Sequence, residues 1–143
     1  MMDALIPSRR VTITDSSDIV RARGAARSLA TDIGFGLADQ TRLATAVSEL
    51  ARNVVQYAGS GSCEIIDASV ADEMRIRIVV EDSGPGIPDI DLAMQDGYST
   101  GGSLGAGLPG TRRLMESFAI ESAPGQTRVT IGLARQRHHQ ERR

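Results

Sequence analysis

The stretch LATAVSELARNVVQY, residues 43–57, carries the clearest helical pattern in the chain. Its apolar side chains recur at spacings of three and four residues, which places them in one stripe along a helix. The members of the stripe are Leu43, Ala46, Val47, Leu50 and Val54. The pattern predicts a helix from about 37 to 57, ended by AGSG at 58–61, with this stripe in the core.

Two polar residues lie on a different side of the same predicted helix. Glu49 and Asn53 are four residues apart, so a carboxylate and an amide project together, away from the densest part of the apolar stripe. A solvated helix face with Arg52 nearby explains this pair more simply than a functional site does. The pair alone therefore does not identify a site.

The flanking sequence predicts alternating helices and strands. DSSD at 15–18 offers N-caps for a helix to about 33, and GFG at 34–36 breaks that helix. Further helices are expected near 90–95 and at 107–117, and strands at 10–14, 63–70, 74–81, 119–122 and 128–134. The order predicts one α/β domain spanning 1–143, a two-layer α+β sandwich with helices on one face of a mixed, mostly antiparallel sheet.

Composition limits the function. All 16 basic residues among the 143 are arginine, the net charge is -2 and aromatics make up only 3%, so the chain has neither the charge nor the stacking groups of a nucleic-acid-binding protein. The basic segment 135–143 is expected to be a frayed end. No stretch suits a membrane span or a signal peptide, so the protein is expected in the cytoplasm. Cys63 is the one cysteine and cannot form an internal disulfide, so it is expected to be a buried core residue.

A loop follows the second strand of the predicted hairpin, in EDSGPGIPD at 81–89. Asp82 stands where a buried strand meets this loop, and Gly84 and Gly86 allow a positive φ and the close approach of a flat ligand. The Asp82 carboxylate can accept a hydrogen bond from an amino group such as that of adenine. An ordinary Gly-Pro turn explains the same residues, so this segment alone does not decide between the two.

The segment STGGSLGAGLPG, at 99–110, places glycines directly before a predicted helix. Glycines keep side chains out of the way, so backbone N–H groups and the helix N-terminus can face an anion. The lysine of a P-loop is impossible because the chain has no lysine, and no Rossmann βαβ fingerprint is present. The pattern favours a phosphate-binding loop of another kind over a flexible surface loop.

Taken together, the three segments resemble the GHKL family of ATPases and kinases, which have the Bergerat ATP-binding fold. The matching motifs are ELARN at 49–53, DSGPG at 82–86 and LGAGL at 104–108. SELARN, EDSGPGIPDI, GYSTGG and LGAGLPG are similar to the RsbT-type serine/threonine kinases, switch proteins of the stressosome, along about 11–133. One departure is that Ser103 occupies a glycine position of the usual RsbT-type lid, S-T-x-G-G-L-G.

The resemblance implies a role for each matching residue. Glu49 would be the base toward a substrate hydroxyl, and Asn53 would bind the Mg²⁺ that bridges the ATP phosphates. Asp82 would recognise adenine, with Gly84 and Gly86 beside it and Thr127 near the base. The lid over the phosphates would comprise Gly101, Gly102, Gly105, Ala106, Gly107 and Leu108. Arg112 and Arg113 in the next helix fit a solvated face better than a phosphate contact.

The implied function is that of an ATP-dependent kinase in bacterial stress signalling, using ATP, releasing ADP and requiring Mg²⁺. Its expected partners are a STAS-domain protein of the RsbS or RsbR type, which it phosphorylates, and an RsbU-like phosphatase of the PP2C type or another output enzyme, which it activates. An anti-sigma factor kinase of the RsbW or SpoIIAB type is an alternative, although this chain lacks the longer charged lid insert of those proteins. A non-catalytic ATP-sensing docking module is another, and the intact Glu49 argues against it.

Overall fold

A five-stranded sheet forms one layer of the protein. The computed structural model describes residues 8–86, 94 and 107–137. The strands are β1 (Ser8–Ile13), β2 (Gly61–Asp67), β3 (Glu73–Asp82), β4 (Ser117–Ala123) and β5 (Gln126–Gln136). Their order is β1-β2-β3-β5-β4, and each described pairing is antiparallel. All five predicted strands are confirmed, with ends shifted by up to three residues.

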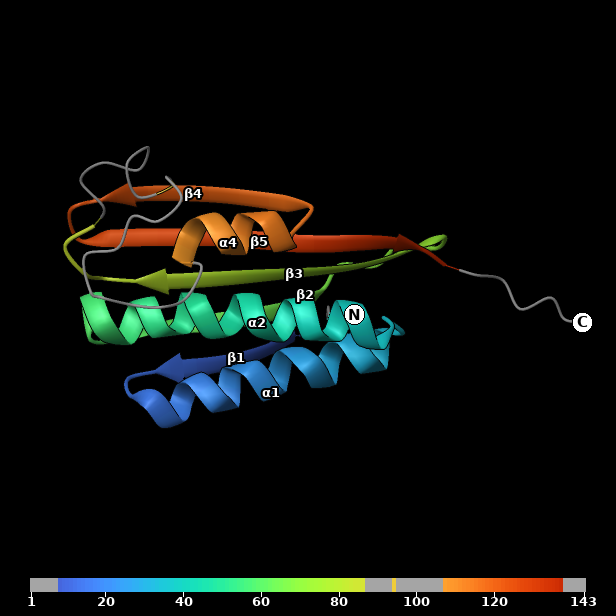
Figure 1. The fold of residues 1–143 in the computed structure, drawn as a ribbon, viewed down its shortest axis with the longest axis horizontal. Coiled ribbons are helices and arrows are strands. Elements are labelled where there is room, and N and C mark those ends of the chain that lie inside the picture. Colours follow the sequence, from blue (N-terminus) through green and yellow to red (C-terminus); the bar gives the residue numbers. More distant parts are fainter. Residues whose placement is uncertain (1–7, 87–93, 95–106, 138–143) are drawn as a thin grey trace, which may run out of the picture.

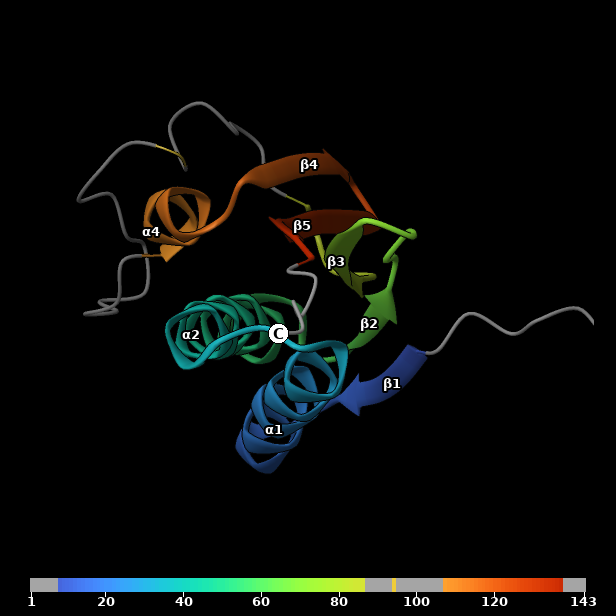
Figure 2. The ribbon, with the colours of Figure 1, turned by 90° about the vertical axis from the view of Figure 1, so that its right-hand side faces the viewer.

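The helices form the second layer, on one face of the sheet. They are α1 (Ser16–Ile33), α2 (Leu37–Asn53) and α4 (Gly107–Leu114). Figure 1 shows the helices lying along the strands, and the end-on view of Figure 2 shows all three on the same side. This arrangement confirms the predicted two-layer α/β fold.

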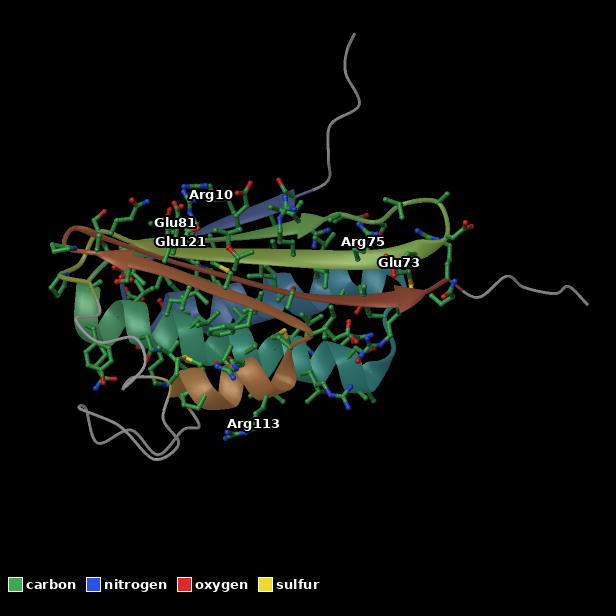
Figure 3. The ribbon with its side chains drawn as sticks, turned by 90° about the horizontal axis from the view of Figure 1, so that it is seen from above. Arg10, Glu73, Arg75, Glu81, Arg113 and Glu121 are labelled. Carbon is green, nitrogen blue, oxygen red and sulfur yellow. The ribbon has the colours of Figure 1, made fainter. Side chains whose placement is uncertain are left out.

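The other face of the sheet carries charged side chains. Arg10, Glu81 and Glu121 point away from the helix layer in Figure 3. Arg128 on β5 forms ion pairs with both Glu81 and Glu121 across the neighbouring strands. Opposite charges in directly paired positions on neighbouring strands stabilise the sheet, so this face can remain exposed to solvent.

Apolar rows on the inner face of the sheet make the core. Ile65, Ile78 and Ile131 are direct neighbours on β2, β3 and β5, and all three are fully buried. The predicted stripe of α2 belongs to the same buried cluster, which confirms that prediction. Burial of each large aliphatic side chain contributes about 1.5–3 kcal/mol, so matching the stripe to these rows fixes α2 on the sheet.

Cys63 is fully buried in the neighbouring row of β2, and desolvation raises the pKa of its thiol to about 12. The expectation that Cys63 is a buried core residue is thus confirmed. Among the residues that the structure describes, no helix is long and apolar enough to cross a membrane.

The ends of α1 follow the sequence pattern. Asp15 is the N-cap and accepts hydrogen bonds from the N–H groups of Ser17 and Asp18. The Asp18 carboxylate, which is nearly buried, accepts bonds of 2.8 and 2.9 Å from the backbone N–H and hydroxyl of Thr14. These bonds, with the neighbouring Arg21, lower the pKa of Asp18. Gly34, at a φ of 120°, ends the helix as GFG predicted.

Two helices end earlier than expected. The α-helical part of α2 stops at Asn53, and residues Val54–Ala58 form a π-helical turn, η1, in which the Gly59 N–H donates to the Val54 carbonyl at 2.8 Å. The prediction of a helix to 117 is wrong beyond Leu114, because Ser117 already pairs with Gly132 of β5. The short helix expected at 90–95 falls outside the described residues apart from position 94.

The expectation of a frayed end from residue 135 is wrong for 135–137. Arg135 lies in β5, and its Nε and Nη2 donate to the two carboxylate oxygens of Asp39 at 2.9 and 2.8 Å. It also pairs with Glu116, while Arg137 donates to two carbonyls of the β2–β3 turn. Hydrogen bonding to Asp39 raises the pKa of Arg135. Residues 138–143 lie outside the described part.

Removing the Arg135 guanidinium is expected to destabilise the protein. Of the bonds to the nearly buried Asp39 carboxylate from described side chains, Arg135→Met leaves the one from Arg42, and it should lower the free energy of unfolding by about 1–3 kcal/mol. The control Arg42→Met keeps both Arg135 bonds and should cost less than about 0.5 kcal/mol. Urea denaturation measures both, and equal losses would contradict the bridging role of Arg135.

Asp18 should contribute to the pH dependence of stability. Because its pKa in the folded state lies below its ordinary value of 3.8, the carboxylate stabilises the fold above that pH, and the contribution is lost as the pH falls through the folded-state value. The difference in unfolding free energy between the native chain and Asp18→Asn should therefore be largest near neutral pH and shrink in acid. A difference that keeps its neutral-pH size as the pH falls below 3.8 would oppose this assignment.

Candidate functional site

The apolar inner face of the sheet gives way to a polar row at one end. Its last apolar row, across β2, β3, β5 and β4, consists of Cys63, Val80, Val129 and Ile120. Two residues further along each strand, on the same face, lies the next row: Gly61, Asp82, Thr127 and Ser122. At this end the core therefore presents a carboxylate and two hydroxyls to the helix layer.

The polar side chains of this row differ in whether their oxygen atoms already have hydrogen-bond partners in the protein. Thr127 is buried, and its hydroxyl lies 2.7 Å from that of Ser122. The half-buried Asp82 accepts the Gly84 N–H on Oδ1 at 2.9 Å, and within the described residues its Oδ2 has no partner. Asp82, and Thr127 through the family resemblance, were named from the sequence, and both lie in this row. Ser122 was not named, although the alternation from Ile120 places it on the same face.

Two glycines allow the backbone to pack tightly around Asp82. A Cβ on Gly84 would lie 2.7 Å from the Ala58 Cβ, and one on Gly61 would lie 2.3 Å from the Glu81 carbonyl oxygen. The turn after β3 is thus pressed against the end of η1, with no room for a side chain between them.

Gly86 fulfils the expected positive φ, at +88°, whereas Gly84 does not need one. A Cβ on Gly86 would also lie 2.5 Å from the Ala123 carbonyl oxygen. In addition, the Gly125 N–H of the β4–β5 turn donates to the Gly84 carbonyl at 3.0 Å. The Asp82 turn is therefore held on a second side by the β4–β5 hairpin.

Glu49 and Asn53 stand one helical turn apart at the end of α2, both half-buried. Arg52 Nη1 donates to Glu49 Oε2 at 2.7 Å, and the Asn53 side chain has no partner among the described residues. Figure 1 places the end of α2, the end of β3 and the β4–β5 turn at the same end of the molecule.

The π-helical turn connects the helix side of the site to the sheet side. It begins directly after Asn53 and ends at Ala58, which abuts Gly84. Single π-turns occur frequently at functional sites, where they reposition the residues on either side. Sequence reasoning expected an α-helix here, because the apolar spacing through Val54 does not distinguish the two forms.

The predicted lid residues are only partly described. Gly101, Gly102, Gly105 and Ala106 lie outside the described residues. Gly107 begins α4, and the Leu108 side chain is buried in the core. Arg112 and Arg113 are exposed on α4, and Figure 3 shows Arg113 pointing outward from it.

This arrangement combines two chemical capabilities. The Asp82 Oδ2, unpartnered within the described residues, lies in one row with the hydroxyls of Thr127 and Ser122, and this suits a flat molecule that donates a hydrogen bond. The Glu49 carboxylate can take a proton, and the Asn53 oxygen can bind a cation. The described residues hold no cluster of three or more His, Cys, Asp or Glu side chains, so a cation here would need oxygens from its ligand or water, as Mg²⁺ commonly does.

Comparison with known proteins gives consistent matches. Residues 38–137 match the family of histidine kinase-, DNA gyrase B-, and HSP90-like ATPases. The chain is 49% identical over 116 residues to the serine/threonine-protein kinase RsbT of Bacillus subtilis (strain 168), covering 81% of this chain and 87% of that protein.

Solved structures show the same fold. The RsbU and RsbW domains of Rv1364c from Mycobacterium tuberculosis align with a TM-score of 0.63 at 20% identity, covering 92% of this chain and 33% of that one. The mycobacterial sensor histidine kinase MprB aligns with a TM-score of 0.55 at 21% identity, covering 93% and 100%. At these identities the likeness concerns the fold alone.

The tight packing at Gly84 can be tested by substitution. In Gly84→Ala the added Cβ overlaps Ala58, so the Asp82 turn must shift, and the free energy of unfolding should fall by about 1–3 kcal/mol. The control Gly24→Ala, in the middle of α1 with nothing within 4 Å, should instead raise it by about 0.5–1 kcal/mol. Equal effects in thermal or urea unfolding would contradict the close approach of η1 and the turn.

Proposed function

This chain belongs to the family of histidine kinase-, DNA gyrase B-, and HSP90-like ATPases, and we propose that it is an ATP-dependent protein serine/threonine kinase of the RsbT type. The observation that carries the proposal is the meeting of two pairs at one end of the molecule: Asp82 with Thr127 on the sheet, and Glu49 with Asn53 on α2. The 49% identity to a protein named as such a kinase supports it.

In this proposal Asp82 recognises adenine. The Gly84 N–H fixes Oδ1, which leaves Oδ2 to accept a bond from the exocyclic amino group. Thr127, paired directly with Asp82 in the sheet, lies where its hydroxyl can also reach the base. Gly84 and Gly86 let this turn pack directly against Ala58 and Ala123, which holds the Asp82 backbone in place.

The phosphates would lie toward the end of α2 and the start of α4. Asn53 is the residue that would hold Mg²⁺, because its side chain is half-buried and unpaired within the described residues. When bound, Mg²⁺ neutralises charge on the phosphates. Backbone N–H groups of the lid would bind the phosphates in place of the missing lysine, from Gly101, Gly102, Gly105, Ala106, Gly107 and Leu108.

Glu49 would act as the general base. Its carboxylate takes the proton of a serine or threonine hydroxyl while the hydroxyl oxygen bonds to the γ-phosphorus and the bond from that phosphorus to the ADP oxygen breaks. The products are a phosphorylated acceptor and ADP. Glu49 is half-buried at the end of α2, so its carboxylate remains reachable by an acceptor protein.

The proposed acceptor is a STAS-domain protein of the RsbS or RsbR type, and the proposed output is activation of an RsbU-like phosphatase of the PP2C type in bacterial stress signalling in the cytoplasm. The identity to RsbT supports this placement.

Two substitutions should separate nucleotide binding from transfer. Asp82→Asn is expected to weaken ATP binding at least about tenfold, because an amide cannot present two acceptor oxygens. Glu49→Gln should leave ATP binding within twofold and slow transfer by about a hundredfold or more. Calorimetry measures binding, and transfer is followed from γ-labelled Mg-ATP to purified STAS-domain proteins from the same genome.

Matched controls are Asp32→Asn, at an exposed ion pair with Arg9, and Glu64→Gln, on β2. Both should behave like the native chain. Transfer that survives Asn53→Ala would contradict the Mg²⁺ assignment. ATP binding without transfer to any STAS protein would favour a docking module, and stoichiometric capture of a sigma factor would favour an anti-sigma factor kinase.

A further inference from the structure

In the helices that the structure describes, three carboxylates accept a bond from an arginine three residues further on, in the pairs Asp18–Arg21, Asp39–Arg42 and Glu49–Arg52. Two of these carboxylates use both oxygens within the protein. Asp18 Oδ2 also takes the Thr14 bonds, and both oxygens of Asp39 bind Arg135. These two pairs belong to the structural framework.

The third pair is different. Within the described residues, Glu49 has one partner, Arg52 on Oε2, and its Oε1 is free. The Glu49 side chain is 14% exposed, whereas that of Arg52 is 44% exposed. A carboxylate that is largely buried, held by one oxygen and open at the other is a poor structural element and a good acceptor for an incoming hydroxyl.

The small energy of this bond also argues against a role in folding. Because the Arg52 side chain is largely exposed to solvent, its pairing at this helical spacing contributes only a few tenths of a kcal/mol to stability, by about the measure of surface pairs. The bond does restrict the carboxylate, because the planar guanidinium donates in a fixed direction and keeps its charge at all working pH values. The effect of Arg52 is thus on the orientation of Glu49.

We propose that Arg52 is a positioning residue, which holds Glu49 Oε2 so that Oε1 faces the hydroxyl of the acceptor protein. The inference rests on the proposed function, in which Glu49 is the base. A general base must come within hydrogen-bonding distance of the proton that it removes, so a carboxylate already held in one orientation reacts more often per encounter. Arg52 itself touches neither nucleotide nor acceptor in this scheme.

A double-mutant cycle tests the proposal. Single-turnover transfer from γ-labelled Mg-ATP to the STAS-domain proteins is measured for the native chain, Arg52→Gln, Glu49→Gln and the double variant. Arg52→Gln should slow transfer about tenfold, with the affinity for ATP and the KM for the acceptor unchanged. In the Glu49→Gln background the same substitution should change the rate by less than twofold, because there is no carboxylate left to orient.

Two further variants complete the experiment. Arg52→Lys retains one positive donor without the planar fork, so its rate should lie between those of the native chain and Arg52→Gln. Arg75→Gln removes an arginine that pairs with Glu73 in β3, and it should transfer at the native rate.

Several results would overturn the inference. A transfer rate of Arg52→Gln equal to that of the native chain would contradict the positioning role. A tenfold loss that persists in the Glu49→Gln background would also contradict it, since Arg52 would then act on the phosphate or the acceptor directly. A raised KM for the acceptor with unchanged kcat would make Arg52 a docking residue. Transfer at the native rate by Glu49→Gln, or none by the native chain, would contradict the proposed function itself and this inference with it.

Discussion

The register of β3 between β2 and β5 is the constraint on which the rest of the structure depends. Side chains alternate between the two faces of a strand, so Ile78, Val80 and Asp82 follow one another on the inner face. The first two are buried in the core, and the third stands at its end. A shift of one residue would turn Asp82 outward and expose both apolar side chains, so the packing that stabilises the sheet also places the carboxylate.

The site also requires close approach of backbone segments. Gly61 and Gly84 bring the end of the sheet against η1, and the π-turn spans the short distance from Asn53 to Ala58. The groups on the sheet and those on α2 are therefore fixed relative to each other by backbone packing. Such a frame suits catalysis by positioning, which is the main contribution of a protein to phosphoryl transfer.

Much of this was predictable from the sequence, because the decisive signals are local. The stripe of α2 and the alternation of the strands reflect burial on one face, and the glycines of the Asp82 turn mark close contacts. The π-turn was not predictable, since Val54 fits either helical form. Nor was the bond from Arg135 to Asp39, which joins residues 96 positions apart and depends on the packing of β5 against the start of α2. The lid glycines remain a prediction.

We propose that the end of α2 and the Asp82 turn form one nucleotide site. The most direct test of this proposal is an NMR titration of the native chain with a non-hydrolysable Mg-ATP analogue, following the backbone amides. We expect the largest shifts to cluster around Asn53, the Gly84 turn and Thr127, with little change at the outer-face residues Arg75 and Thr130. Shifts concentrated on the outer face of the sheet, or none at saturating analogue, would contradict it.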